Sequence, residues 1–167
     1  MKYKIDQLKR SYKKSDFKCG TTLLDTYLHK QASQDVKRKL TACFVLIDTD
    51  KNVMGYYTLS SSGIPREFAP EKMVKKMPPT YSQLPVTLLG RLAVDKSMQG
   101  NSYGELLLMD ALKKSYEVSA SAIGSLAVVV NPIDKKAEGY YKKFGFILLP
   151  GTKKMFLEMN YIAKLFE

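Results

Sequence analysis

Residues that commonly bind metals or form disulfides are scarce in this sequence. Its 167 residues include two cysteines, Cys19 and Cys43, and one histidine, His29. So few nitrogen and sulfur ligands make a zinc or iron site of the usual kind improbable, and no metal is expected. Two separated cysteines favour free thiols in a reducing compartment over a disulfide framework. His29 has polar neighbours, which predict an exposed structural side chain.

Long hydrophobic runs are also absent. The longest, such as residues 126–130, fall well short of the roughly 18 residues that cross a bilayer. No positively charged start leads into an apolar stretch. We therefore expect a cytoplasmic protein with no membrane partner. Hydrophobic residues make up 45% and charged residues 26% of the chain, which is typical of one packed domain, here residues 1–167.

Acidic residues are outnumbered by basic ones. The chain contains 16 Asp and Glu residues and 27 Lys and Arg residues, which gives a net charge of +11. Basic clusters occupy residues 2–14, 37–39, 72–76 and 142–154. This excess predicts a polyanionic partner, such as nucleic acid, a phosphorylated cofactor or an acidic protein. The alternative is a basic, well-solvated surface with no specific partner.

Hydrophobic periodicity predicts an α/β (α+β) domain with a mixed sheet in three layers. A long proline-rich loop, with one helical turn starting at Pro70, is expected over residues 61–85. A capping box at Thr22 and Asp25 marks the start of the first helix. The expected strands cover residues 3–8, 42–47, 53–60, 86–94, 126–130, 145–149 and 155–158, and the expected helices cover residues 22–37, 105–116 and 135–143.

The segment between the strand ending at Val94 and the following helix has the features of an anion site. It reads Gln99-Gly100-Asn101-Ser102-Tyr103-Gly104. Small residues let the backbone approach a ligand, and a helix N-terminus offers unpaired N–H groups and positive partial charge, so a phosphate fits. Alternatively, Gly100 and Gly104 only allow a turn and close helix packing.

Two motifs resemble the GCN5-related N-acetyltransferase (GNAT) superfamily. The loop is similar to its acetyl-CoA pattern Gln/Arg-x-x-Gly-x-Gly/Ala, with Ser102 at the first patterned glycine, where serine fits if its φ is negative. The segment Ala137-Glu138-Gly139-Tyr140-Tyr141-Lys142-Lys143-Phe144-Gly145-Phe146 resembles its late aromatic signature. The resemblance implies a mostly antiparallel central sheet flanked by helices.

The same resemblance implies a set of residues that bind acetyl-CoA (coenzyme A). The strand residues Leu92, Ala93 and Val94 would offer backbone groups to the pantetheine arm, although their side chains suit an ordinary core. Asn131 ends the next strand, where it would orient a ligand or water, or instead cap the following helix. The loop contributes Gln99, Gly100, Asn101, Ser102, Tyr103 and Gly104.

Four further stretches resemble one branch of the superfamily, the acetyltransferase toxins of bacterial toxin–antitoxin pairs. They lie within residues 17–35, 55–60, 89–95 and 126–130. The resemblance implies acetyl transfer to the amino group of aminoacyl-tRNA, which blocks translation. It also implies a homodimer and a small DNA-binding antitoxin as partner.

Transfer from a thioester to an amine needs a proton for the departing thiolate. Tyrosine has a reference pKa of about 10 and stays protonated at neutral pH, so it can supply that proton. The resemblance puts Tyr141 beside the sulfur, which makes it the candidate catalytic acid. The alternative is that Tyr140 and Tyr141 are both core aromatics of a short helix.

The strand over residues 86–94 contains no Asp or Glu, so a carboxylate base has no counterpart there. At pH 7 an α-amino group is neutral in roughly one molecule of seven, whereas a lysine amine is neutral in roughly one of a few thousand. The absence therefore favours an α-amine as acceptor. Arg91 interrupts this strand, and such a charge needs either a substrate or a structural salt bridge.

Three functions remain in competition at this point. The first is acetyl transfer to aminoacyl-tRNA. The second keeps acetyl-CoA but acts on a small-molecule amine or a protein N-terminus. The third, a non-enzymatic nucleic-acid-binding module, accounts for the charge but not for the loop and the late tyrosine.

Overall fold

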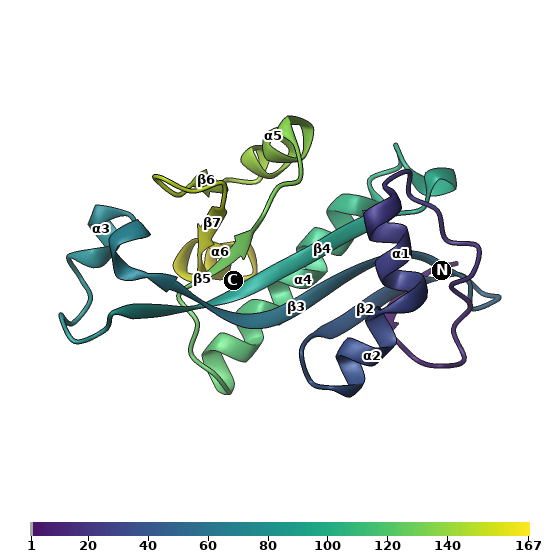
Figure 1. Ribbon diagram of the computed structural model, residues 1–167, viewed down its shortest axis with the longest axis horizontal. Coiled ribbons are helices and arrows are strands. Elements are labelled where there is room, and N and C mark those ends of the chain that lie inside the picture. The colour runs from purple at the N-terminus through teal and green to yellow at the C-terminus, as the bar shows by residue number, and fades with distance from the viewer. Residues whose placement is uncertain (1) are drawn as a thin grey trace. The chain divides into compact units, whose positions relative to one another are not determined.

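The computed structural model describes residues 2–167. Seven strands in this part of the chain form one sheet in the order β1-β2-β3-β4-β5-β7-β6 (Figure 1). The strands are β1 Lys4–Gln7, β2 Ala42–Ile47, β3 Val53–Pro65, β4 Gln83–Val94, β5 Ala127–Val130, β6 Ile147–Leu148 and β7 Met155–Glu158. The helices are α1 Thr22–Lys30, α2 Ala32–Lys37, α3 Glu71–Val74, α4 Tyr103–Ser121, α5 Lys135–Lys143 and α6 Met159–Leu165, with 3-10 turns η1 Arg66–Phe68 and η2 Lys96–Met98.

The sheet is mixed and mostly antiparallel, as expected. β1 pairs with β2, β2 with β3, β5 with β7 and β6 with β7 in antiparallel fashion. β4 and β5 are parallel, and their register runs from Thr87 opposite Val128 to Leu89 opposite Val130. β4 then continues through Gly90 to Val94, beyond the stretch paired with β5.

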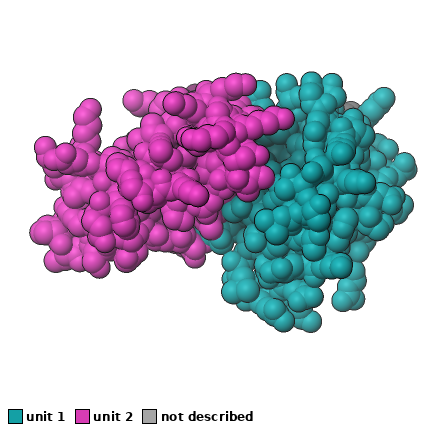
Figure 2. All heavy atoms as spheres, turned by 45° about the horizontal axis from the view of Figure 1, so that its top comes forward, with its two compact units in different colours: residues 1–60, 90–111 teal, residues 61–89, 112–167 magenta. Residues whose placement is uncertain are grey.

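The chain divides into two compact units, shown in teal and magenta in Figure 2. The first comprises the chain up to Ser60 together with residues 90–111, and the second comprises residues 61–89 and 112–167. In the first unit, Leu28 and Ala32 pack with Val45 and Tyr56 on one face of the sheet. Alternate residues face α4, where a Cβ on Gly55 would lie 2.9 Å from Leu107 Cδ1 and 3.1 Å from the Ala93 carbonyl oxygen, so a side chain there would force its neighbours to move.

The second unit has its own core, in which Val86, Val129, Leu149 and Phe156 are buried. The predicted proline-rich loop belongs to this unit and is more regular than expected. β3 extends to Pro65 and β4 begins at Gln83. The single helical turn was predicted correctly, since α3 starts directly after Pro70.

Arg66 organises the segment between these two strands. Its guanidinium donates hydrogen bonds to four backbone carbonyls, those of Val74 (3.1 Å), Met77 (3.1 Å), Pro78 (2.7 Å) and Tyr81 (3.1 Å). A planar group with five N–H donors can satisfy carbonyls that converge from several directions. The segment therefore folds around one charged side chain rather than around an apolar core of its own.

One predicted helix is divided in the structure, and one helix was not predicted. The helix expected over residues 22–37 breaks at Gln31, whose φ and ψ are −124° and −31°. An unbroken helix would separate residues 27 and 35 by about 12 Å along its axis, yet the Tyr27 hydroxyl donates to the Asp35 carboxylate at 2.8 Å. α6 was not predicted at all.

The capping box expected at Thr22 is also absent. Thr21 precedes the first turn of α1 and makes no side-chain capping bond. Asp25 instead accepts a hydrogen bond from the Cys19 backbone N–H at 2.8 Å. None of the helices described in residues 2–167 has both the length and the apolar character needed to cross a membrane.

Candidate active site

The end of β4, the loop and the first half of α4, residues 90–111, lie within the first unit, and Asp95 fixes the start of the loop. The Asp95 carboxylate accepts hydrogen bonds from the Ser97 backbone (3.1 Å), the Ser97 hydroxyl (2.7 Å) and the Lys18 backbone (2.8 Å). Burial by itself raises the pKa of Asp95, but these hydrogen bonds outweigh it and the pKa falls below its usual value. The carboxylate is thus a charged anchor between the end of β4 and the N-terminal segment.

Gln99, predicted as a cofactor ligand, uses its side chain to hold the loop. Its amide nitrogen donates to the Val94 carbonyl at 2.9 Å and to the Cys19 carbonyl at 2.7 Å. These bonds tie the loop back onto β4 and onto the segment before α1. They also occupy the Val94 carbonyl, one of the backbone groups expected to serve the pantetheine arm.

The loop backbone adopts two left-handed residues in close succession. Gly100 has φ +83° and Ser102 has φ +65°. The expectation that Ser102 would fit with a negative φ was wrong, because the serine keeps the left-handed conformation that glycine favours. A Cβ on Gly100 would meet no atom within 4 Å, so the space over this residue is open to a ligand.

Beyond the loop, α4 begins at Tyr103 and includes Gly104 in its first turn. The first N–H groups of a helix have no partner within the helix, and they carry positive partial charge. Together with the open space over Gly100, these N–H groups are donors of the kind that bind phosphate groups in proteins. Asn101 adds only long contacts of 3.4 Å from its side-chain nitrogen to the Met98 and Gln99 carbonyls.

Arg91 does not form the structural salt bridge that was one of the two alternatives weighed for it from the sequence, because it has no carboxylate partner within the described residues. Its guanidinium carbon lies 3.4 Å from the centre of the Tyr27 ring. Tyr27 in turn donates to buried Asp35, and burial followed by this hydrogen bond raises the pKa of Tyr27.

The sequence did not predict that Arg91 stacks on Tyr27 or that Tyr27 is held by Asp35. A cation over an aromatic ring is attracted by the ring's negative face. The stacking leaves the N–H edges of Arg91 without an acceptor among the described residues. Tyr27 and Asp35 gave no signal because they lie in what looked like one continuous helix.

Tyr141 lies in the second unit, on α5, and its side chain is 9% exposed. Its ring packs edge to face against Tyr140 and Phe146, with centroid distances of 5.5 and 5.3 Å. The hydroxyl makes no hydrogen bond to any described residue. Burial, and secondarily Tyr140, raises the pKa of Tyr141, so the hydroxyl keeps its proton at neutral pH.

Asn131 also lies in the second unit, directly after β5. It does not cap α5, because Asp134 does so by accepting a hydrogen bond from the Ala137 backbone at 2.8 Å. The Asn131 side-chain oxygen instead accepts from Lys154 Nζ at 3.0 Å. That lysine was not singled out in the sequence, since nothing local connects residues 131 and 154.

The cysteines and the histidine contribute no reactive group to the candidate site residues of the first or the second unit. Burial raises the pKa of Cys19 to about 11 and that of Cys43 to about 12, so both thiols stay protonated and unreactive. His29 is half-buried with its Nε2 enclosed and without a hydrogen bond, so the prediction that it is exposed was wrong. Within residues 2–167 no three His, Cys, Asp or Glu side chains gather in a group suited to a metal.

Comparison with known proteins agrees with the resemblance seen in the motifs. The sequence profile of the acetyltransferase (GNAT) family matches residues 5–146. A tRNA-acetylating toxin of Mycobacterium tuberculosis (strain ATCC 25618 / H37Rv) is 35% identical over 136 residues, which are 81% of this chain and 79% of that protein.

Two solved structures extend the similarity to 99% of both chains. One is a Tyr-to-Phe mutant of KacT, at 30% identity and a TM-score of 0.92. The other is AtaT complexed with acetyl-methionyl-tRNAfMet, at 31% identity and a TM-score of 0.91. A structure described as AtaTR bound with acetyl-CoA is also similar, at a TM-score of 0.88. The profile match and the identity to these relatives show that the chain belongs to the GNAT acetyltransferase family.

Proposed function

We propose that this protein transfers the acetyl group of acetyl-CoA to the amino group of an aminoacyl-tRNA and thereby blocks translation. The observation that carries the proposal is the similarity of nearly the whole chain to proteins named for that activity or complexed with its product. The net charge of +11 suits a polyanionic substrate.

The donor set of the first unit fits coenzyme A. The left-handed residues Gly100 and Ser102 and the start of α4 would hold the pyrophosphate through backbone N–H groups. Because the β5 pairing of β4 ends at Leu89, the backbone of Leu92 and Ala93 would serve the amides of the pantetheine arm, whereas the Val94 carbonyl already accepts from Gln99. When bound, acetyl-CoA supplies the activated acetyl group as a thioester.

Tyr141 would act as the general acid. Its hydroxyl is protonated at neutral pH and has no competing hydrogen bond, so it can give its proton to the departing thiolate sulfur. Arg91, fixed by its stacking on Tyr27, would bind an anionic group of the acceptor. No Asp or Glu occurs on β4, which suits an α-amine that is partly neutral without a strong base.

Relatives of this chain also suggest its partners. A KacTA complex with DNA and an AtaT complex with the C-terminus of the antitoxin AtaR have been solved. We infer that this chain is likewise neutralised by a small DNA-binding antitoxin, acts as a homodimer and works in the cytoplasm, where charged tRNA is found.

The test uses labelled acetyl-CoA with charged and uncharged tRNA pools at low and high salt. We expect label on charged tRNA alone, and much less of it at high salt because released counterions weaken phosphate contacts. Tyr141→Phe protein serves as the control for enzymatic transfer. Label on a small polyamine or a protein N-terminus, with none on aminoacyl-tRNA, would refute the substrate and leave the acetyltransferase assignment intact.

A further inference from the structure

A basic cavity lies at the β1 edge of the sheet, within the first unit. Its volume is about 540 Å³. It is open to solvent and is bordered by the start of β1, the loop after β1 and the turn between β2 and β3. Four lysines line it, Lys2, Lys4, Lys9 and Lys51, and none of them belongs to the proposed cofactor loop.

The carboxylates in and beside the cavity are already bound to other groups. Asp48 lines it, but one of its oxygens accepts from the Asp50 and Asn52 backbone N–H groups, both at 2.9 Å. Its other oxygen accepts from the Asn52 side chain at 3.1 Å. Asp48 therefore holds the β2–β3 turn in shape and places Lys51 at the cavity wall.

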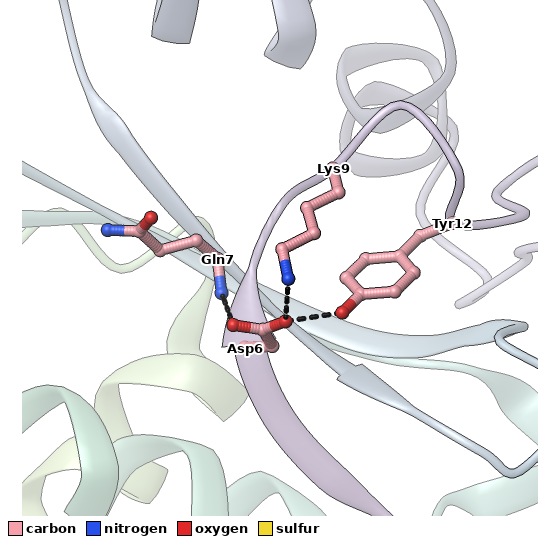
Figure 3. A network of polar contacts seen from close by, with 4 residues as sticks. All are labelled: Asp6, Gln7, Lys9 and Tyr12. Atoms are coloured by element: carbon pink, nitrogen blue, oxygen red, sulfur yellow. Dashed lines mark hydrogen bonds and ion pairs between the residues drawn. The ribbon is translucent and has the colours of Figure 1, made fainter.

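The negative charge of the Asp6 carboxylate is balanced by a neighbouring network of polar contacts, drawn in Figure 3. The carboxylate accepts a hydrogen bond from the Tyr12 hydroxyl, pairs with Lys9 at 3.0 Å and accepts from the Gln7 backbone at 2.8 Å. Lys9 is thus committed to an internal partner. The remaining lysines of the cavity, Lys2, Lys4 and Lys51, have no carboxylate partner among residues 2–167.

The cavity lies next to the proposed cofactor loop in the same unit. Tyr3, which lines the cavity, packs edge to face on Tyr103, with ring centroids 5.3 Å apart. Tyr103 begins α4 at the end of that loop. A polyanion held by these lysines would therefore lie beside the start of α4.

We propose that the cavity lined by Lys2, Lys4 and Lys51 binds the phosphodiester backbone of the tRNA substrate. This inference rests on the proposed function. Lysine ammonium groups are mobile point charges, which suit phosphates regardless of base sequence. Lys2 and Lys4 lie at the start of β1 and Lys51 lies on the β2–β3 turn, and charges spread over two segments match successive phosphates along a strand better than one compact anion.

The experiment compares two doubly substituted proteins with the parent. The cavity variant combines Lys4→Gln with Lys51→Asn, because asparagine tolerates the left-handed φ of +67° at position 51. The matched control combines Lys37→Gln with Lys39→Asn, which removes the same charge from exposed positions of the same unit, including a second left-handed lysine at φ +65°. Melting temperatures verify that both proteins fold.

The first measurement is binding of aminoacyl-tRNA as a function of salt. In the cavity variant the slope of log affinity against log salt should become shallower by about two, one unit for each lost phosphate contact. The KM for tRNA should rise several-fold, while kcat and the KM for acetyl-CoA stay at the parent values. The control should retain the parent slope.

Two results would overturn the assignment of the cavity. Equal loss of slope in both variants would show that the whole basic surface contributes alike. A raised KM for acetyl-CoA with unchanged tRNA binding would assign the lysines to a coenzyme A phosphate instead. A parent protein that binds charged tRNA without acetylating it refutes the proposed function, and the binding slopes still decide the inference.

Discussion

The left-handed serine in the cofactor loop allows a sharp test of the loop's geometry. Ser102 has φ +65°, and no hydrogen bond holds its hydroxyl among the described residues. A side chain in this region costs roughly 1–2 kcal/mol relative to glycine. Glycine also lowers the free energy of unfolding by roughly 0.5–1 kcal/mol, because it increases the conformational entropy of the unfolded chain. Ser102→Gly should therefore raise the free energy of unfolding by about 0.5–1 kcal/mol.

For a chain of this length, 1 kcal/mol corresponds to about 2–4 °C in melting temperature. The expected shift for Ser102→Gly is thus about 1–4 °C upward, measured by differential scanning calorimetry without ligand. Ser102→Ala keeps the Cβ and should stay near the parent. Ser119→Gly, a glycine introduced inside α4, should lower the melting temperature because it adds freedom to the unfolded chain without relieving strain.

The same proteins should be titrated with acetyl-CoA. Because glycine keeps the loop conformation that serine already adopts, affinity should stay within a factor of about three of the parent. A Ser102→Gly protein that melts at or below the Ser102→Ala protein would refute the strained geometry. A large loss of affinity in a stabilised Ser102→Gly protein would separate the loop's stability from its proposed role in binding.

Three other changes test other parts of the molecule. Tyr141→Phe should lower kcat by roughly two to four orders of magnitude with unchanged acetyl-CoA affinity, and a kcat within a factor of three would make the tyrosine structural. Arg66→Lys should cost about 1–3 kcal/mol and speed hydrogen exchange over residues 66–82, since an ammonium cannot reach four carbonyls; unchanged exchange there would refute the organising role. Hydrogen bonds from Tyr12 and Lys9 lower the pKa of Asp6 from 3.8 to about 2, so its contribution to stability is present above about pH 4 and is lost as the pH falls towards 2. The free energies of unfolding of the parent and of Asp6→Asn, measured by urea titration, should converge as the pH falls over that interval. A difference that stays constant with pH would contradict the lowered pKa of Asp6.

The sequence alone determined the elements whose signal is local. Period-two and period-3.6 patterns located the β2–β3 hairpin, α5 and β7, because the alternation of side chains is written directly in the chain. The loop and the late Tyr140-Tyr141 segment identified the family for the same reason: their chemistry depends on neighbouring residues. The break at Gln31 escaped notice, since the hydrogen bond from Tyr27 to Asp35 that it permits is tertiary.

Only the tertiary structure decided what the individual polar side chains do. Gln99 binds the carbonyl of Cys19, 80 residues away, Arg91 stacks on Tyr27, and Asn131 accepts from Lys154. The left-handed φ of Ser102 likewise depends on how the loop is held at both ends. A sequence pattern specifies which groups need partners. Burying a polar group without a hydrogen bond destabilises the folded state only, so the packing of the folded chain determines which distant residue becomes the partner.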